Sequence, residues 1–145
     1  DGFNSLAHVR PPLRAESDKE LLRQGVKSGV IDAICTHHEP LSSSAKLAPF
    51  AETQPGITAF DTYVAFGVQL VREGLFSPLE WVEKVTLAPA TVANMLERWT
   101  AEAGWVLVDP ELDWIVNKDN ILSQGKNTPL INQVVKGKVE RIFII

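Results

Sequence analysis

An abrupt change from a helical pattern to a short apolar run, within residues 17–35, constrains the fold more than any other feature of this sequence. Ser17 and Glu20 have the spacing of a capping box, in which both side chains bind backbone N–H groups at the start of a helix. Gly29 is suited to end that helix, because glycine readily adopts the left-handed conformation required there. The run from Val30 to Cys35 is typical of a buried parallel strand. A helix that leads directly into such a strand predicts an α/β fold.

Further elements follow the same reasoning. Residues 58–73 carry apolar side chains at helical spacing before Gly74, and Ser77 with Pro78 predicts the start of another helix. Residues 89–98 predict a third helix. The C-terminal part is rich in strand-like segments, which we expect at residues 105–109, 114–116, 133–135 and 139–145, with residues 136–138 joining the last two.

Residues 37–55 have the composition of one long loop, and a loop of this length in a compact domain is usually functional or disordered. His37 and His38 begin it, directly after the predicted strand. Neighbouring side chains of an extended chain point to opposite faces, so we expect these two histidines not to face one site. His38 is expected to be structural and bonded to backbone, and His8 to be an ordinary loop histidine. Cys35 is expected to be a buried, unreactive thiol.

Composition excludes several classes of function. The net charge is −4, and the 14 lysines and arginines are scattered, so nothing indicates nucleic-acid binding. No apolar run predicts a membrane span. One cysteine in 145 residues favours a reducing compartment, and we expect the cytoplasm. The chain begins with Asp1 rather than methionine, which suggests a processed or trimmed chain or a piece of a longer protein.

Five short blocks, taken in their order and spacing, resemble the C-terminal part of the dihydroorotases. The blocks are residues 10–14, 31–40, 46–52, 54–57 and 124–129. The resemblance implies an amidohydrolase fold, in which a (β/α)₈ TIM barrel carries zinc at the C-terminal ends of its strands beside a small β domain. It also implies the interconversion of carbamoyl aspartate and dihydroorotate in pyrimidine synthesis. We therefore expect the C-terminal portion of such a barrel at residues 1–100 and strands of the small β domain at residues 101–145.

The sequence departs from the family at the positions that carry its chemistry. The family's aspartate, a metal ligand and proton shuttle, is replaced by His37, and a substrate-binding histidine is replaced by Leu41. An asparagine that can touch substrate is replaced by Arg10. Pro55 and Gly56 match a family turn that presents backbone groups to substrate, and they are expected to persist as a turn. The resemblance thus implies vestigial substrate positions and no intact catalytic residue.

No complete zinc site is expected from this chain, because the family's other metal ligands lie upstream of the matched part and only three histidines are present. His37 is the candidate for a surviving metal ligand, although we favour a local hydrogen-bonding role.

The loop most resembles that of noncatalytic dihydroorotase-like proteins, pseudoenzymes that act as structural partners of aspartate transcarbamoylase. This implies an assembly subunit that binds the transcarbamoylase catalytic chain. The alternative is an active zinc-dependent dihydroorotase, a hydrolase of cyclic amides, once the chain is joined to an N-terminal half. A third reading is a fragment with no function of its own. Incomplete barrel elements also predict association with the missing N-terminal part of the barrel or with a second copy.

Overall fold

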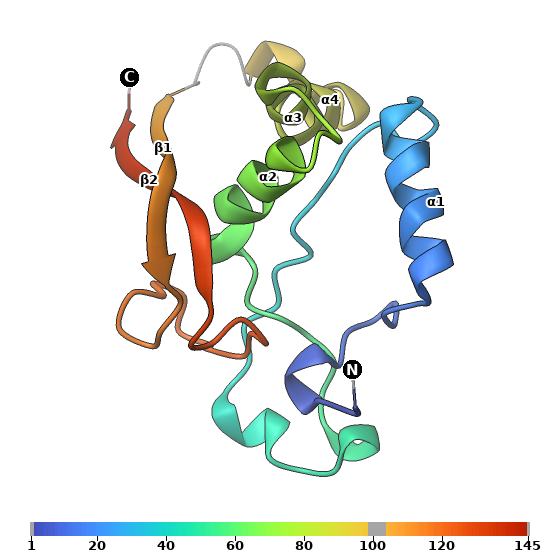
Figure 1. Cartoon of the computed structure of the whole chain (residues 1–145), viewed down its shortest axis with the longest axis vertical. Helices are drawn as coiled ribbons and strands as arrows, with labels where there is room; N and C mark the ends of the chain where they lie inside the picture. The colour runs from blue at the N-terminus through green and yellow to red at the C-terminus, as the bar shows by residue number, and fades with distance from the viewer. Residues whose placement is uncertain (1, 99–103, 145) are drawn as a thin grey trace. The chain divides into compact units, whose positions relative to one another are not determined.

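The computed structural model describes residues 2–98 and 104–144 (Figure 1). The helices are α1 (Glu16–Lys27), α2 (Tyr63–Arg72), α3 (Pro78–Val85) and α4 (Leu87–Val92). Strands β1 (Trp105–Ile115) and β2 (Val134–Phe143) pair in a two-stranded sheet. Short 3-10 turns lie at η1 (Ser5–Ala7), η2 (Ser43–Lys46), η3 (Phe50–Glu52) and η4 (Phe60–Thr62), and residues 96–98 are also helical. No helix in the described ranges is both long enough and apolar enough to cross a bilayer.

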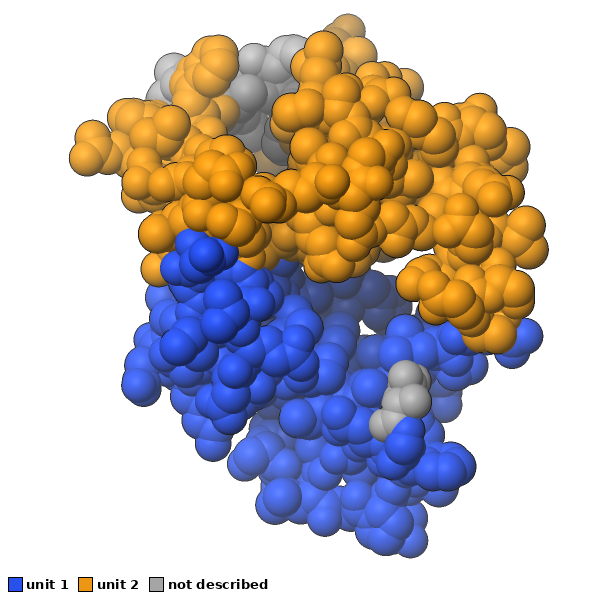
Figure 2. Space-filling view, viewed as in Figure 1, with its two compact units in different colours: residues 1–14, 36–63, 113–135 blue, residues 15–35, 64–112, 136–145 orange. Residues whose placement is uncertain are grey.

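The chain forms two compact units, each assembled from three stretches of sequence (Figure 2). Unit 1 contains residues 1–14, 36–63 and 113–135, and unit 2 contains residues 15–35, 64–112 and 136–145. This division by contacts differs from the predicted domains. The predicted boundary at residues 100–101 lies outside the described residues and stays a prediction.

Unit 2 has an apolar core. The buried side chains of this core are Val26, Ala65, Leu70, Phe76, Trp81 and Ala90. Trp81 of α3 has Phe66 and Phe76 as ring neighbours, with ring centroids 6.3 and 6.4 Å away. The indole also lies directly over Gly67 of α2, where a larger residue would leave no room for it. Burial of this tryptophan is therefore coupled to a glycine in the facing helix.

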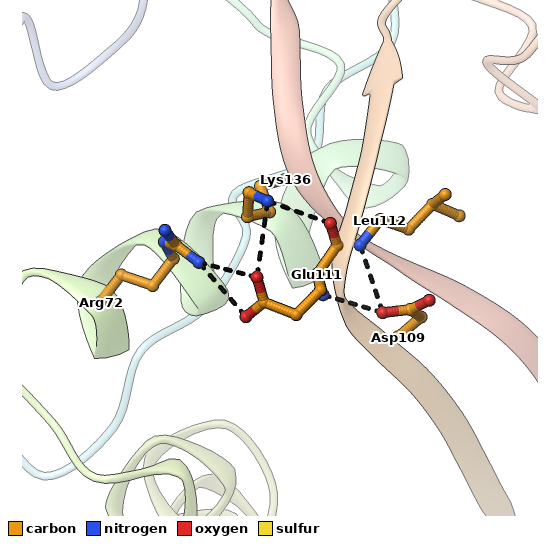
Figure 3. Close-up of polar contacts among 5 residues, drawn as sticks. All are labelled: Arg72, Asp109, Glu111, Leu112 and Lys136. Carbon is orange, nitrogen blue, oxygen red and sulfur yellow. Dashed lines mark hydrogen bonds and ion pairs between the residues drawn. The ribbon is translucent and has the colours of Figure 1, made fainter.

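Ion pairs on the surface of unit 2 join elements that are distant in sequence. Lys27 of α1 lies 2.9 Å from Glu80 of α3. Glu111 of β1 binds two cations: both of its carboxylate oxygens lie 3.2 Å from Nη1 of Arg72, and Lys136 approaches one of them at 3.5 Å (Figure 3). Lys136 also donates a hydrogen bond to the Glu111 carbonyl at 3.0 Å. Glu111 thus connects α2, β1 and β2.

Two helix ends were predicted correctly from residues close to them in the sequence. Ser77 accepts from the backbone N–H of Glu80, and the Glu80 carboxylate accepts from the Ser77 N–H, so the predicted helix start at Ser77 and Pro78 is confirmed. Gly29 has a φ of 80° at the end of α1. The start of α1 was predicted too late, because the Asp18 carboxylate accepts from the backbone N–H of Ala15 at 3.2 Å and so performs the capping.

Two other predicted helices have different bounds. The segment 58–73 starts as η4 and becomes α2 at Tyr63, and Phe60, which was expected on the buried face, is 63% exposed. The third helix was expected at residues 89–98, but α4 spans Leu87–Val92 and helical residues resume at 96–98. Asn94 adopts a φ of 54°, which interrupts the helical path between them.

The predicted strand at residues 30–35 is absent from the described structure. A strand needs a neighbouring strand, and here the backbone pairs with helix α3 instead, because Ile34 N–H donates to the Lys84 carbonyl at 3.0 Å. Lys84 Nζ also binds the Ile31 carbonyl at 3.2 Å. Without covering strands Val30 is 80% exposed. Cys35 is exposed too, so the prediction of a buried thiol is wrong.

The C-terminal strands are longer than predicted. Residues 105–109 and 114–116 were read as separate strands, yet β1 runs through Trp105–Ile115 without interruption. Residues 136–138 were read as a connection but lie inside β2. Gly137 has a φ of 95° and is buried against Val68, whose Cγ2 would lie 2.6 Å from a Cβ at this position. Glycine lets the strand continue where another residue would clash.

Candidate functional site

The loop that begins at His37 belongs to unit 1 and starts with an unusual backbone conformation. His37 has a φ of 44°, in the left-handed region, and its side chain is exposed. His37, His38 and Glu39 line an open depression of about 260 Å³. The prediction that the two histidines would not face one site assumed an extended backbone, which His37 does not have, and it stays a prediction. Within the described structure the His37 ring takes no hydrogen bond.

His38 has a structural role. Its Nδ1 accepts hydrogen bonds from the backbone N–H groups of Ala59 and Phe60, both at 3.1 Å. The ring also stacks on Phe60, with centroids 4.3 Å apart and an angle of 13° between the planes. Because Nδ1 acts as the acceptor, the neutral ring carries its proton on Nε2. The expectation that His38 is bonded to backbone is confirmed: it caps the turn that leads into α2.

The interior of unit 1 is mostly polar, so hydrogen bonds define its geometry. The buried polar residues are Lys46, Thr53, Thr58, Thr62, Asn127 and Thr128, whereas Val116 and Ile121 are the buried large apolar residues. Every buried side-chain polar atom in the described residues has a hydrogen-bond partner. Such a network fixes chain positions closely, because each unpaired group would cost free energy.

Asn127 is the centre of this network. Its Oδ1 accepts from the Leu41 N–H at 2.7 Å and lies 2.8 Å from the Thr58 hydroxyl. Its Nδ2 donates to the carbonyls of Glu39 and Gly56, both at 3.1 Å. One buried carboxamide therefore joins the His37 loop to Gly56. Sequence reasoning missed Asn127, although it lies inside the block 124–129 that carried the family resemblance.

Residues 55 and 56 were expected to persist as a turn, but the structure has no regular turn there, and Gly56 is instead fully engaged with distant parts of unit 1. The Gly56 N–H donates to the His8 carbonyl at 2.9 Å, and the Gly56 carbonyl accepts from Asn127. Gly56 has a φ of 144°, and a Cβ there would lie 3.0 Å from side-chain atoms of Glu39 and Leu41. Glycine is required both by conformation and by this close packing.

The remaining predicted site residues fall into two groups. The network brings Leu41 and Gly56 together, with Pro55 beside them. Arg10 is exposed and takes no part in the network. His8 lies in the loop after η1, where its ring stacks on Phe50 at 4.5 Å and Nδ1 lies 2.8 Å from the Thr53 hydroxyl. The loop reading of His8 is confirmed.

Two charged side chains of unit 1 also anchor loops. Lys46 donates to the carbonyls of His8 and Gln54 at 3.1 and 2.7 Å; its burial lowers the pKa of the amine, and the nearby Glu39 carboxylate partly offsets this. Asp61 accepts from the Leu122 N–H at 2.6 Å and the Ser123 hydroxyl at 2.5 Å. Partial burial opposes ionisation of Asp61, but these hydrogen bonds outweigh it and lower the pKa of the carboxyl. Neither residue was identified from the sequence.

The residues of this chain do not by themselves fit a zinc ion. The described residues contain no group of three or more histidine, cysteine, aspartate or glutamate side chains placed to hold a metal. Of the two neighbouring histidines, His38 already uses Nδ1 as an acceptor. A catalytic zinc takes about three protein ligands and one open position. No step of any mechanism is therefore assigned to a metal held by these residues.

Comparison with known proteins agrees with the resemblance read from the sequence. No family model matches the chain. A dihydroorotase-like protein of Pseudomonas aeruginosa is 36% identical over 146 residues, which is 99% of this chain and 34% of that protein. A dihydroorotase of Syntrophus aciditrophicus is 36% identical over 94% of this chain and 33% of its own length. The chain is dihydroorotase-like in sequence over nearly its whole length.

Solved structures give the fold of this dihydroorotase-like chain. A D-hydantoinase (dihydropyrimidinase) from a Thermus species matches 97% of this chain and 32% of its own, with a TM-score of 0.83 at 19% identity. Another D-hydantoinase gives a TM-score of 0.81 at 22% identity. The expected fold class, a C-terminal portion of an amidohydrolase barrel with strands of the small β domain, is confirmed. The chain spans about a third of the length of the curated relatives it matches.

Proposed function

We propose that this protein is a noncatalytic dihydroorotase homologue of pyrimidine biosynthesis, acting in the cytoplasm as a structural subunit for the catalytic chain of aspartate transcarbamoylase. The observation that carries the proposal is the residue at the family's acid position, which here is His37. The His37 ring is exposed and has no hydrogen-bond partner among the described residues, and the His37 backbone is in the left-handed conformation. The transcarbamoylase role is implied by the resemblance of this loop to noncatalytic relatives.

The chemistry of the replacement supports a lost activity. A carboxylate supplies negative charge to a metal and a base that can accept a proton from its bound water. A neutral imidazole supplies neither that charge nor a carboxylate's geometry. Loss of a positioned general base alone typically lowers a rate by about 10²–10⁴-fold.

The substrate positions support the same conclusion. The family's turn offers backbone groups to substrate, but the Gly56 N–H is bonded to the His8 carbonyl and the Gly56 carbonyl is bonded to Asn127. Leu41 offers an apolar side chain where the family has a histidine. A substrate carboxylate would thus lose a polar partner at Leu41 and meet backbone groups at Gly56 that the protein already uses.

The proposal is tested on the native-length protein in two assays. With zinc supplied, we expect no turnover of dihydroorotate above background, and we expect the mass of the transcarbamoylase assembly to fall when this protein is withheld. The double variant His37→Asp, Leu41→His restores two family residues, and any turnover it gains would locate the loss at these positions. Zinc-dependent turnover by the unaltered protein, or an unchanged assembly without it, would refute the proposal.

One observation favours a second candidate, an active zinc-dependent dihydroorotase. The His37 ring is unengaged and opens into the same depression as His38 and Glu39, so it could serve as ligand or base when the rest of a barrel supplies the other groups. If a hydrolase activity is demonstrated, His37→Ala should abolish it, whereas Ser43→Ala in the same loop should not. Retained activity in the His37 variant would exclude this candidate.

We also propose that the apolar surface of unit 2 associates with the remaining part of an amidohydrolase barrel or with a second copy. Leu21 and Leu22 of α1 are 65% and 57% exposed, and Val30 is 80% exposed. In the described structure the backbone N–H groups of Ala33 and Cys35 donate no hydrogen bond. Residues two positions apart in an extended chain direct their N–H groups to the same side, so these two donors would lie on one edge of the segment. Unpaired backbone beside apolar surface is a template for strand pairing.

Cys35 gives this association a direct readout. Sizing of the chain by light scattering should show a complex rather than a monomer, and alkylation of the Cys35 thiol should slow when the complex forms. A clean monomer at high concentration, with an alkylation rate independent of concentration, would count against association.

A further inference from the structure

We propose that Asn127 is the positioning residue of the His37 loop: its carboxamide sets the backbone of residues 39–41 relative to Gly56. This inference does not depend on whether the loop catalyses a reaction or is vestigial. It rests on contacts within unit 1 alone.

The carboxamide of Asn127 is matched to its surroundings on both sides. Oδ1 accepts from the Leu41 N–H at 2.7 Å and lies 2.8 Å from the Thr58 hydroxyl, whose single proton it shares with the Gly125 carbonyl at 2.7 Å. Nδ2 faces two acceptors, the carbonyls of Glu39 and Gly56, both at 3.1 Å. The residue is only 3% exposed, so water cannot replace these partners. A side-chain amide offers two donor hydrogens and an acceptor oxygen with two lone pairs, and all are used.

Only a carboxamide satisfies this arrangement. A carboxylate of the same shape would place a second acceptor against two carbonyl oxygens. An apolar side chain would leave the Leu41 N–H and the carbonyls of Glu39 and Gly56 unpaired, whereas the Thr58 hydroxyl would keep the Gly125 carbonyl as its partner. A buried group without its partner costs the full penalty of removing it from water. The identity of the side chain, rather than its size, therefore controls the arrangement.

Close packing brings the segment that carries Asn127 directly onto the loop. A Cβ on Gly125 would lie 2.5 Å from the Leu41 nitrogen and 2.7 Å from the Leu41 oxygen, so backbone approaches backbone here with no side chain between. The position of Asn127 itself has a separate anchor, because the Thr58 N–H donates to the Asn127 carbonyl at 3.0 Å. A change of side chain can therefore release the loop while this backbone bond remains.

The isosteric variant Asn127→Asp tests the proposal through a pH titration followed by NMR. When the new carboxyl is protonated, it can still donate one hydrogen bond to a carbonyl. When it ionises, it repels the carbonyl oxygens of both Glu39 and Gly56. Burial against two carbonyls should place its midpoint above the usual value of about 4. Above that midpoint we expect the amide resonances of residues 37–41 to shift and exchange of the Leu41 amide to quicken by about tenfold. The Trp81 indole signal in unit 2 should not change.

The matched control is Asn132→Asp, which makes the same chemical change at an exposed asparagine of the same unit. At each pH it should leave the loop resonances where they are in the unaltered chain. The other ionisable groups on segments around Asn127 are common to both variants and to the unaltered chain, so their effects can be subtracted. These groups are His8, His37, His38, Glu39, Lys46 and Lys126.

A second measurement needs no variant and so remains decisive if Asn127→Asp fails to fold. In the unaltered protein the side-chain amide protons of Asn127 should exchange at least about tenfold more slowly than those of Asn132, because hydrogen-bonded buried amides are protected. Equal exchange rates would overturn the proposal. So would a folded Asn127→Asp variant whose loop resonances are independent of pH. Neither readout involves turnover or transcarbamoylase, so failure here is distinct from failure of the proposed function.

Discussion

Gly67 of α2 lies so close to the indole of Trp81 in α3 that a methyl group at this glycine would overlap the ring. The two helices of unit 2 can approach this closely only because one of them has no side chain at the contact. Trp81 is 9% exposed as a result, and it is the largest side chain in the core.

We expect Gly67→Ala to destabilise the protein by about 1–3 kcal/mol or more, since overpacking a core forces side chains or backbone to move. Urea unfolding followed by tryptophan fluorescence measures this change. Gly25→Ala is the matched control, a glycine inside α1 whose added Cβ meets the flexible end of Ile31 at 3.1 Å. Alanine favours a helix interior over glycine by up to about 1 kcal/mol, so the control should be neutral or stabilising. An unchanged free energy of unfolding for Gly67→Ala would show that α2 and α3 can move apart without loss of stability.

The neighbouring histidines should respond in opposite ways to alanine substitution. His38→Ala leaves the N–H groups of Ala59 and Phe60 without their acceptor and should cost about 1–3 kcal/mol. His37→Ala, one residue earlier, removes an exposed ring without hydrogen bonds and should change stability by no more than about 0.5 kcal/mol. Thermal unfolding of the two variants side by side measures the contrast. Equal losses would mean that the His38 ring does not cap the turn.

The capping box of α3 should produce a low carboxyl pKa. The Glu80 carboxylate interacts with the Ser77 N–H, the Lys27 amine and the Ser77 side chain. These interactions lower the pKa of the Glu80 carboxyl from 4.5 to about 2. Because the folded-state pKa is depressed, the stabilising contribution is complete above the unfolded value and is lost as pH falls from about 4.5 towards 2.

A carbon-detected NMR titration of the Glu80 carboxyl measures this value. Lys27→Met and Ser77→Ala should each raise the midpoint, because each removes a group that favours the ionised form. Ser17→Ala, a serine in α1 that does not cap a helix here, should leave it unchanged. An unperturbed Glu80 midpoint in the unaltered protein would contradict the capping geometry.

The Glu111 cluster of Figure 3 should contribute little and be sensitive to salt. The Glu111 side chain is 72% exposed, so its pairs with Arg72 and Lys136 are screened by water. We expect Glu111→Gln to cost less than about 1 kcal/mol in low salt and close to nothing in 1 M salt, where the screening length is about 3 Å. Urea unfolding at the two ionic strengths decides this. A larger cost that persists in high salt would indicate a packing role for the side chain.

Prediction from sequence succeeded where the determining residues are neighbours in the chain. Ser77 and Glu80 cap α3 because they are three positions apart, and Gly29 ends α1 through its own backbone conformation. The segment at residues 30–35 could not be read this way. Its apolar pattern is that of a strand, but a strand needs a neighbouring strand, and in the described residues this segment has α3 as its backbone partner and leaves Cys35 exposed.

The candidate site, like the fold, was predicted only in part. The family pattern pointed to the His37 loop and to Gly56, and the backbone bonding of His38 was predicted. The left-handed conformation of His37 could not be, because it follows from how the rest of the loop is tied down. Asn127 was missed since its partners Glu39 and Leu41 lie 88 and 86 positions away in sequence, beyond the reach of any local pattern.

That separation has a consequence for the order of events during synthesis. The Glu39–Leu41 backbone emerges from the ribosome long before Asn127 does, and until then its Leu41 N–H and Glu39 carbonyl have only water as partners. The loop can therefore reach its final arrangement only after the segment that carries Asn127 has been translated. A message truncated before the codon for Asn127 would yield a polypeptide that carries the His37 loop without the carboxamide that positions it.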